Sequence, residues 1–264
     1  MKDNFCVISF ADKEPYLSEV KQLEKLCIES ELKFKLYDFE WLKKTYVYEI
    51  NKKLFNNKKC GYCAWKPYII LDALKSYDKV LYLDSSMIFD KNHIEEYINI
   101  NNNNYIVSMK TGLMAYEYTK QETFDIMECN ENIYKYAYQV WAGAILVDKQ
   151  SECFLLEWLY YCLMEDCISD EFDENINHDL KYCLYDQSIY SILYEKYNIE
   201  KINSVQNNDE GKYFYFADTR ELSNRKAIIS RFGENMMNLQ DSLCLKYYND
   251  YISNGSVCYI EEKI

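Results

Sequence analysis

Histidine, proline and glycine are scarce in this chain, with 2, 2 and 6 copies among 264 residues. With only His93 and His178, a Ser/His/Asp triad and a zinc site that uses histidine are both poorly supported. Neither G-x-x-x-x-G-K-[ST] nor G-x-G-x-x-G occurs, so the glycine-rich loops that cradle phosphates in P-loop and dinucleotide-binding proteins are excluded.

Basic residues are outnumbered: 30 Lys and Arg stand against 43 Asp and Glu, which gives a net charge of -13. This balance argues against nucleic acid as a partner, although an anionic small ligand needs only a local cationic pocket. No apolar run approaches the roughly 20 residues of a membrane span. The start, "MKDNFCVISFADKEP", reaches charge too soon for a secretory signal. We therefore expect a cytoplasmic protein without a transmembrane segment.

Cysteine is plentiful, with 11 copies, but the odd number and the chain length do not suit a disulfide framework. Cys6, Cys27, Cys153 and Cys162 lie in apolar patterns and are expected to act as small core residues. "CGYC" gives Cys60 and Cys63 the spacing of half a zinc site or a redox pair. No second C-x-x-C accompanies it, which favours coincidence.

Strand and helix patterns alternate through the first half of the chain. The expected strands are 4–11, 33–39, 79–83, 104–109 and 138–148, with terminal strands in "KYFYFAD" and "KAIISRF". The expected helices start at Pro15 and at Pro67, with others over about 41–55, 150–164 and 186–197. This order predicts an α/β fold whose mostly parallel sheet is flanked by helices, with ligands beyond the carboxyl ends of its strands.

An apolar strand ends abruptly at Asp84-Ser85-Ser86 in "VLYLDSS". Asp84 either accepts hydrogen bonds from a loop, or it is an oxygen ligand for a divalent cation whose other ligands are substrate phosphates. In "AWKP", Lys66 precedes the helix that starts at Pro67. There it is either a solvated lysine or part of a phosphate site that combines an ammonium group with a helix N-terminus.

Two further positions have both a structural and a functional interpretation. Gly143 in "QVWAGAILV" marks either a packing need or a place where a ligand approaches the strand. Asp186 in "LYDQS" is either a helix N-cap or a carboxylate at a pocket, acting as a general base or as a contact to a sugar hydroxyl.

In order, "VISFA", "GYCAWKPYIILDAL", "VLYLDSS", "QVWAGAILV", "FLLEWL" and "YDQSIYSIL" resemble small nucleotide-sugar-dependent glycosyltransferases of the GT-A fold, of the kind found in polysaccharide and glycan assembly. The resemblance covers roughly 5–193. It implies one GT-A-like (Rossmann-like) domain over 1–264, with a nucleotide-binding half (1–110) and an acceptor- and sugar-binding half (111–264).

The resemblance also implies roles for individual residues. Asp84 and Ser86 match the D-x-D-like element that holds Mn²⁺ or Mg²⁺, and Asp186 matches the carboxylate beside the reacting carbon, here the expected base. The implied nucleotide and donor contacts are Ser9, Phe10, Ala11, Trp65, Lys66, Ser85, Trp141, Ala142, Gly143, Gln187 and Arg231. Serine in the third position of Asp84-Ser85-Ser86 departs from the usual second carboxylate and implies weaker metal binding, or direct help from Lys66.

The expected reaction moves a sugar from a UDP- or GDP-linked donor to a glycan hydroxyl, with metal assistance and inversion. Retention stays open, because the D-Q pair also occurs in retaining enzymes of this fold. Two alternatives remain: a catalytically silent nucleotide-sugar-binding domain, which the missing second carboxylate favours, and a nucleotidyltransferase, whose usual glycine-rich loop is missing from "VISFADKEP".

Overall fold

The computed structural model describes residues 4–57, 59–89, 94–99, 106–108, 110–197 and the short strand at 217–218. Its strands are β1 Phe5–Phe10, β2 Phe34–Tyr37, β3 Lys79–Leu83, β4 Met87–Ile88, β5 Ile106–Val107, β6 Lys110–Met114, β7 Tyr138–Val140, β8 Ala144–Asp148 and β9 Ala217–Asp218. Its helices are α1 Tyr16–Glu29, α2 Phe39–Leu42, α3 Tyr46–Ile50, α4 Lys52–Phe55, α5 Lys66–Leu74, α6 Ile94–Ile98, α7 Ala115–Tyr118, α8 Gln121–Ile126, α9 Asn132–Lys135, α10 Glu152–Cys162, α11 Glu165–Ile168 and α12 Asp186–Lys196. Two short turns are η2 Cys60–Cys63 and η3 Lys149–Ser151.

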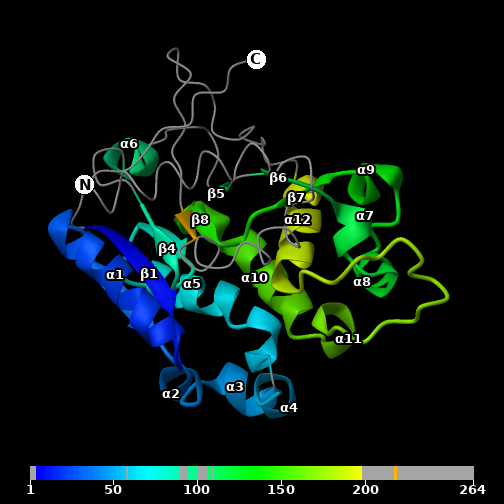
Figure 1. Ribbon diagram of the computed structural model, residues 1–264, viewed down its shortest axis with the longest axis horizontal. Coiled ribbons are helices and arrows are strands. Elements are labelled where there is room, and N and C mark those ends of the chain that lie inside the picture. Colours follow the sequence, from blue (N-terminus) through cyan, green and yellow to red (C-terminus); the bar gives the residue numbers. More distant parts are fainter. Residues whose placement is uncertain are drawn as a thin grey trace.

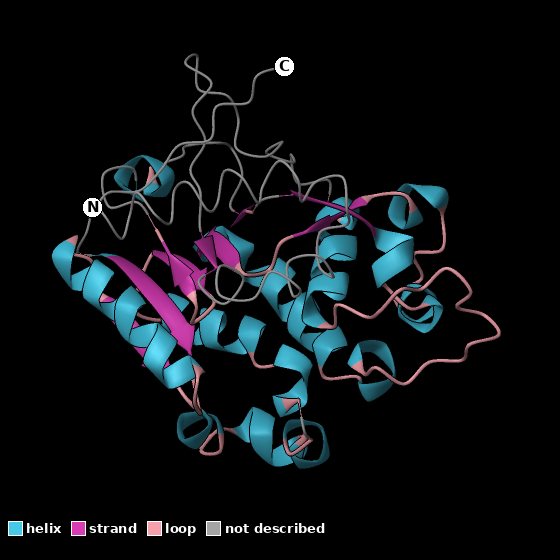
Figure 2. Ribbon diagram, viewed as in Figure 1, coloured by secondary structure: helices cyan, strands magenta, loops and turns pink. Residues whose placement is uncertain are grey.

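The central sheet has five strands in the order β2-β1-β3-β8-β5. Figure 1 labels β1, β8 and β5 of this sheet, and Figure 2 draws the strands in magenta. β1 pairs in parallel with β2 and with β3, whereas β8 is antiparallel to both β3 and β5. All strands of this sheet except β8 therefore point the same way. The predicted α/β fold with a mostly parallel sheet is confirmed. Two two-stranded sheets, β4-β9 and β6-β7, lie outside the central one.

Helices cover both faces of the central sheet, which explains why the middle of β1, β3 and β8 is apolar on both faces. Cys6 and Ile8 of β1 pack with α5, α10 and α12 on one face, and Phe5 and Val7 pack with α1 and α6 on the other. Successive side chains of a strand point to opposite faces, so a strand buried on both sides has no polar alternation.

Several expected boundaries differ from the structure because side chains cap short elements. The strand expected at 33–39 ends at Tyr37, because the Asp38 carboxylate accepts a hydrogen bond from the Trp41 N–H (2.6 Å) and starts α2. The helix expected over 41–55 is three short helices, α2 to α4, and Thr45 caps the second of them through Tyr48 N–H (3.2 Å). The helix expected over 150–164 is η3 followed by α10.

The strand expected at 138–148 is instead two strands in two different sheets. β7 pairs with β6, and β8 pairs with β3 and β5, so residues 141–143 connect the two sheets. Of the strand expected at 104–109, residues 106–108 are described, and β5 covers Ile106–Val107. Of "KYFYFAD" only β9 is described, which pairs with β4, and "KAIISRF" lies outside the described residues.

Nine cysteines are free thiols in the described part of the chain. Cys6, Cys27 and Cys162 are buried as expected, but Cys153 is exposed on α10, so its assignment to the core was wrong. Within the described ranges, no helix has both the length and the apolar character needed to span a bilayer.

Candidate functional site

A cavity of about 570 Å³ lies beyond the carboxyl ends of β1 and β3. Its walls come from the ends of these strands, the segment 11–16, the segment 59–66, strand β6, the connection 141–143 and the segment 182–187. The cavity is therefore where the topology of an open α/β sheet places a ligand.

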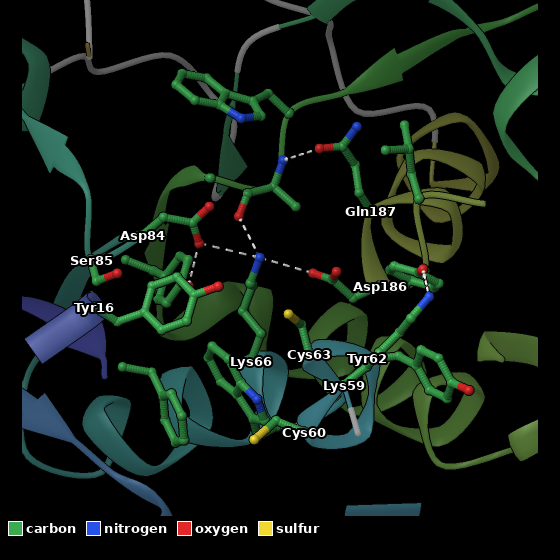
Figure 3. A pocket seen from close by; sticks show the side chains of 18 of the residues that line it. Tyr16, Lys59, Cys60, Tyr62, Cys63, Lys66, Asp84, Ser85, Asp186 and Gln187 are labelled. Atoms are coloured by element: carbon green, nitrogen blue, oxygen red, sulfur yellow. Dashed lines mark hydrogen bonds and ion pairs between the residues drawn. The ribbon is translucent and has the colours of Figure 1, made fainter. Parts of the chain in front are cut away.

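Lys66 lies at the centre of the charged groups in this cavity (Figure 3). Its Nζ is 2.9 Å from Asp186 Oδ2 and 3.5 Å from Asp84 Oδ1, and it donates a hydrogen bond to the Ala142 carbonyl oxygen at 3.0 Å. The side chain is 5% exposed. Burial acts to lower the pKa of Lys66, but the Asp186 and Asp84 carboxylates outweigh burial and raise it. The ammonium group therefore stays charged and bridges the two carboxylates.

The start of α5 fixes Lys66 in this place. Pro67 lies in the first turn of the helix, where its missing N–H costs no hydrogen bond. Trp65, the residue before the helix, is buried and stacks on Phe10 of β1, with ring centroids 3.9 Å apart. The buried Trp65 thus anchors this turn against the sheet, and Lys66 itself is buried rather than solvated.

Asp84 follows β3 directly and is the more accessible of the two carboxylates, with 29% of its side chain exposed. Its Oδ1 accepts a hydrogen bond from the Tyr82 hydroxyl at 2.5 Å, and its backbone N–H donates to the Gly143 carbonyl oxygen at 2.9 Å. The bond to Gly143 thus fixes the backbone of Asp84, and the bond from Tyr82 fixes its carboxylate, which lines the cavity.

Asp186 is the first residue of α12, and Tyr185 occupies the N-cap position, so the expected N-cap role of Asp186 was wrong. Its side chain is 7% exposed and pairs with the Lys66 ammonium. Burial raises the pKa of Asp186 to about 6, with a further contribution from Asp84, and Lys66 opposes the rise. Asp186 is a carboxyl group that can take up and release a proton close to neutral pH.

The connection 141–143 lies against both carboxylate-bearing segments. The Ala142 carbonyl oxygen accepts from Lys66, and its N–H donates to Gln187 Oε1 at 3.2 Å. A Cβ on Gly143 would lie 2.7 Å from Trp141 Nε1 and 3.1 Å from Asp84 Oδ2. Close approach of Asp84 and Trp141 therefore explains the glycine, which sits in a connection and not inside a strand.

Most residues predicted for the site line this one cavity: Phe10, Ala11, Trp65, Lys66, Asp84, Ser85, Trp141, Ala142, Gly143, Asp186 and Gln187. Ser9 and Ser86 do not line it, and both are buried. The Ser9 hydroxyl donates to the Leu83 carbonyl oxygen at 2.7 Å and so joins β1 to β3. Arg231 lies outside the described residues. The roles assigned to all of these residues stay predictions.

Sequence reasoning missed a group of lining residues that includes Lys59, Tyr62 and Tyr185. The segment "CGYC" stood out in the sequence for its two thiols, but in the structure its unusual feature is the backbone conformation. Cys60, Gly61, Tyr62 and Cys63 all have positive φ, between 51° and 70°. Among the described residues, no group of three or more His, Cys, Asp or Glu side chains is placed to hold a metal ion.

No protein-family model and no curated protein sequence matches the chain. Solved structures of other proteins do resemble parts of the chain. One is a glycosyltransferase involved in glycosylation of the major capsid of PBCV-1, with TM-score 0.37 and 12% identity over 59% of this chain. The match spans 65% of that enzyme's own length. The galactosyltransferase LgtC matches with TM-score 0.36 and 17% identity over 72% of this chain and 70% of its own. Mouse xyloside xylosyltransferase 1 matches with TM-score 0.39 and 10% identity over 74% and 82%. At TM-scores below 0.5, the activity of this chain has to be argued from its own residues.

Proposed function

We propose that this protein is a glycosyltransferase that moves a sugar from a UDP- or GDP-linked donor to a hydroxyl of a glycan acceptor. One observation carries the proposal: Asp84 and Asp186, which are 102 positions apart in the sequence, lie on opposite sides of the Lys66 ammonium in a cavity at the carboxyl ends of β1 and β3. This arrangement supplies two carboxylates in different environments, one half-buried and one buried with a raised pKa.

The size and position of the cavity suit a nucleotide-sugar. Its volume of about 570 Å³ lies within the roughly 300–1,000 Å³ of typical small-molecule sites. Phe10 and Ala11, at the end of β1, offer an apolar edge to a base and ribose. Asp84 and Ser85 then lie next along the sheet edge, where we place the diphosphate.

The charge balance of the site argues for an additional cation. Lys66 carries one positive charge between two carboxylates, so the three groups together are negative when both carboxylates are ionised. A diphosphate brought beside them is repelled unless a divalent ion compensates for it. Lys66 thus favours phosphate binding by offsetting the charge of the two carboxylates, and not by pairing with the phosphates itself.

The described residues fit a Mg²⁺ or Mn²⁺ ion that takes one protein carboxylate and completes its coordination with donor phosphates. Asp84 would hold it, because this carboxylate lines the cavity and 29% of its side chain is exposed there. Ser86, the other predicted ligand, is buried and does not line the cavity. Such an ion would supply Lewis-acid stabilisation of the leaving nucleoside diphosphate.

Asp186 is the residue we propose as general base. With a pKa of about 6 it is mostly ionised at neutral pH, and it can accept the proton of an acceptor hydroxyl as the bond to the sugar forms. A single positioned base suits direct displacement with inversion. Lys66 holds this carboxylate in place and Gln187, the next residue, holds the Ala142 backbone beside it.

The test is donor turnover. Wild type, Asp84→Ala and Asp186→Asn would be assayed with a panel of UDP- and GDP-sugars and Mn²⁺, following release of the nucleoside diphosphate with and without acceptor glycans. We expect Asp84→Ala to lose metal-dependent donor binding in a thermal-shift assay. Asp186→Asn should still bind donor but lose transfer by roughly 10²–10⁴-fold. If wild type and Asp84→Ala release nucleoside diphosphate at the same slow rate, the protein is a binding domain and not a transferase.

The setting of the reaction also remains part of the proposal. A role in polysaccharide assembly, a cytoplasmic location and a single domain with two functional halves follow from the sequence resemblance alone. Fractionation of the native protein and the identity of the acceptor that it glycosylates are the measurements that address them.

A further inference from the structure

Two segments of the cavity wall contact each other at two separate points. The segment 59–66 provides Lys66, which pairs with Asp186 at 2.9 Å. The same segment provides Lys59, whose Nζ contacts the hydroxyl of Tyr185, the residue directly before Asp186. Figure 3 shows Lys59 and Tyr62 on the same side of Lys66 as Asp186, and away from Asp84.

The backbone at Tyr185 is in a conformation that favours glycine. Its φ is 53° and its ψ is -119°, close to the roughly +60° and -120° of the first central residue of a type II′ turn. The Gln187 N–H closes this turn on the Leu184 carbonyl oxygen at 3.0 Å. A non-glycine residue persists there only when its surroundings hold it.

Four side chains form a cluster around the turn at Tyr185. We call this cluster the tyrosine clamp; its members are Lys59, Tyr62, Asp170 and Tyr185. Asp170 accepts from Lys59 Nζ at 2.5 Å through Oδ2 and from the Tyr62 hydroxyl at 2.7 Å through Oδ1. The Tyr62 and Tyr185 rings lie 5.1 Å apart, and Lys59 Nζ is 4.8 Å from the centre of the Tyr185 ring. Every member of the clamp contacts at least two others.

The turn η2 delivers two members of the clamp. Its run of positive φ from Cys60 to Cys63 begins right after Lys59 and contains Tyr62. Asn57 stabilises the run, since its Oδ1 accepts from the N–H groups of Lys59 and Gly61, each at 2.9 Å. A Cβ on Gly61 would lie 2.7 Å from Phe55 Cδ1, so the turn packs tightly against α4. The clamp therefore connects two places where non-glycine residues have positive φ: the turn at 60–63 and Tyr185.

We propose that Lys59 is a positioning residue: through the tyrosine clamp it holds the strained turn at Tyr185, and so places Asp186 against Lys66. Lys59 touches neither of the carboxylates assigned to the reaction. The consequence for catalysis rests on the proposed function, whereas the positioning itself can be measured without any substrate.

Other charged or titratable groups also face Asp186 and must be kept constant in the test. They are Lys66 of α5, Asp84 and Tyr82 at the end of β3, Cys63 of η2 and Cys162 of α10. None belongs to the clamp. A substitution at Lys59 therefore leaves the immediate partners of Asp186 unchanged.

The experiment is amide hydrogen exchange at Gln187 and Ser188, whose N–H groups bond to Leu184 and Tyr185 carbonyl oxygens in the first turn of α12. It is read together with the ¹³C signal of the Asp186 carboxyl at fixed pH in EDTA. Lys59→Met should speed exchange at both amides roughly 5- to 150-fold and move the Asp186 signal. This factor corresponds to the ~1–3 kcal/mol of a strained backbone residue. Tyr185→Phe, which keeps the ring and removes the hydroxyl, should act in the same direction.

Lys196→Met is the matched control, because Lys196 pairs with Glu157 at 2.7 Å near the other end of the same helix. It should leave both readings as in wild type, and Lys59→Arg should restore most of the protection lost in Lys59→Met. The proposal is overturned if Lys59→Met changes neither reading, if Lys196→Met changes them equally, or if arginine rescues nothing. A failed donor assay together with a positive exchange result would reject the transferase assignment and keep the positioning role.

Discussion

Replacing Lys66 by methionine tests the buried charge arrangement most directly. Methionine keeps most of the volume of lysine and removes its charge, so Asp186 loses its partner while it stays buried. Removing one member of a buried ion pair typically costs about 3–5 kcal/mol, because the other charge is left uncompensated. We expect a loss of this size in the free energy of unfolding at pH 8.

The dependence on pH identifies the cause. In wild type the pKa of Asp186 is raised from 3.8 to about 6, so its contribution to stability is full below pH 3.8 and is lost as pH rises through about 6. Without Lys66 the pKa of Asp186 rises further, and the loss continues above pH 6 at about 1.4 kcal/mol per pH unit. Between pH 6 and pH 8 the variant should therefore lose up to about 2.7 kcal/mol more than wild type.

Urea denaturation at pH 5, 6, 7 and 8 measures this difference, provided that the m-values of variant and wild type agree. Lys196→Met serves as the comparison, since it removes a partly exposed pair at 2.7 Å and should cost only about 0.2–1 kcal/mol at each pH. A loss for Lys66→Met that is constant between pH 5 and pH 8, or as small as that of the comparison, would refute the buried bridge between Asp84 and Asp186.

Three further outcomes follow from the same geometry. Gly143→Ala should lower the free energy of unfolding by about 1–3 kcal/mol, seen as a lower Tm, because the new Cβ would contact the Trp141 indole and the Asp84 carboxylate. In the donor assay, kcat/KM should fall on the acid side of about pH 6 as Asp186 takes up a proton, and a profile flat from pH 5 to pH 8 would exclude it as the base. Removal of divalent ions with EDTA should abolish donor-induced thermal stabilisation of wild type, and Asp84→Ala should show none even with Mn²⁺ added.

The sequence predicted the parts of the fold that depend on local patterns. The apolar runs of β1 and β3 and the proline starts of α1 and α5 appear where expected, since burial on both faces and a fixed φ are properties of the residues themselves. The rule that ligands bind beyond the carboxyl ends of the strands in α/β sheets pointed to the residues after β1 and β3, and Phe10 and Asp84 do line the same cavity.

Other features could not be predicted because they depend on distant contacts. The pattern at 138–148 is mostly apolar, and only the pairing of its first part with β6 and of its last part with β3 shows that it divides into two strands. Asp186 has the sequence position of a helix cap, yet the ammonium of Lys66 determines where its carboxylate lies. The sequence "LYD" also gives no sign of the strained conformation of Tyr185, whose hydroxyl contacts Lys59, itself paired with Asp170 of a third segment.

The three-residue connection at 141–143 links the two sheets mechanically. Its peptide groups form hydrogen bonds with Lys66 of α5, with Gln187 of α12 and with the Asp84 N–H at the end of β3. A shift of the two-stranded β6-β7 sheet (the β6-β7 ribbon) relative to the central sheet would therefore strain these hydrogen bonds, which lie in the wall of the cavity. β6 itself contributes Thr111 and Leu113 to the cavity wall. A ligand that fills the cavity should therefore stiffen the β6-β7 ribbon, and the packing of the ribbon should in turn affect how tightly the ligand is held.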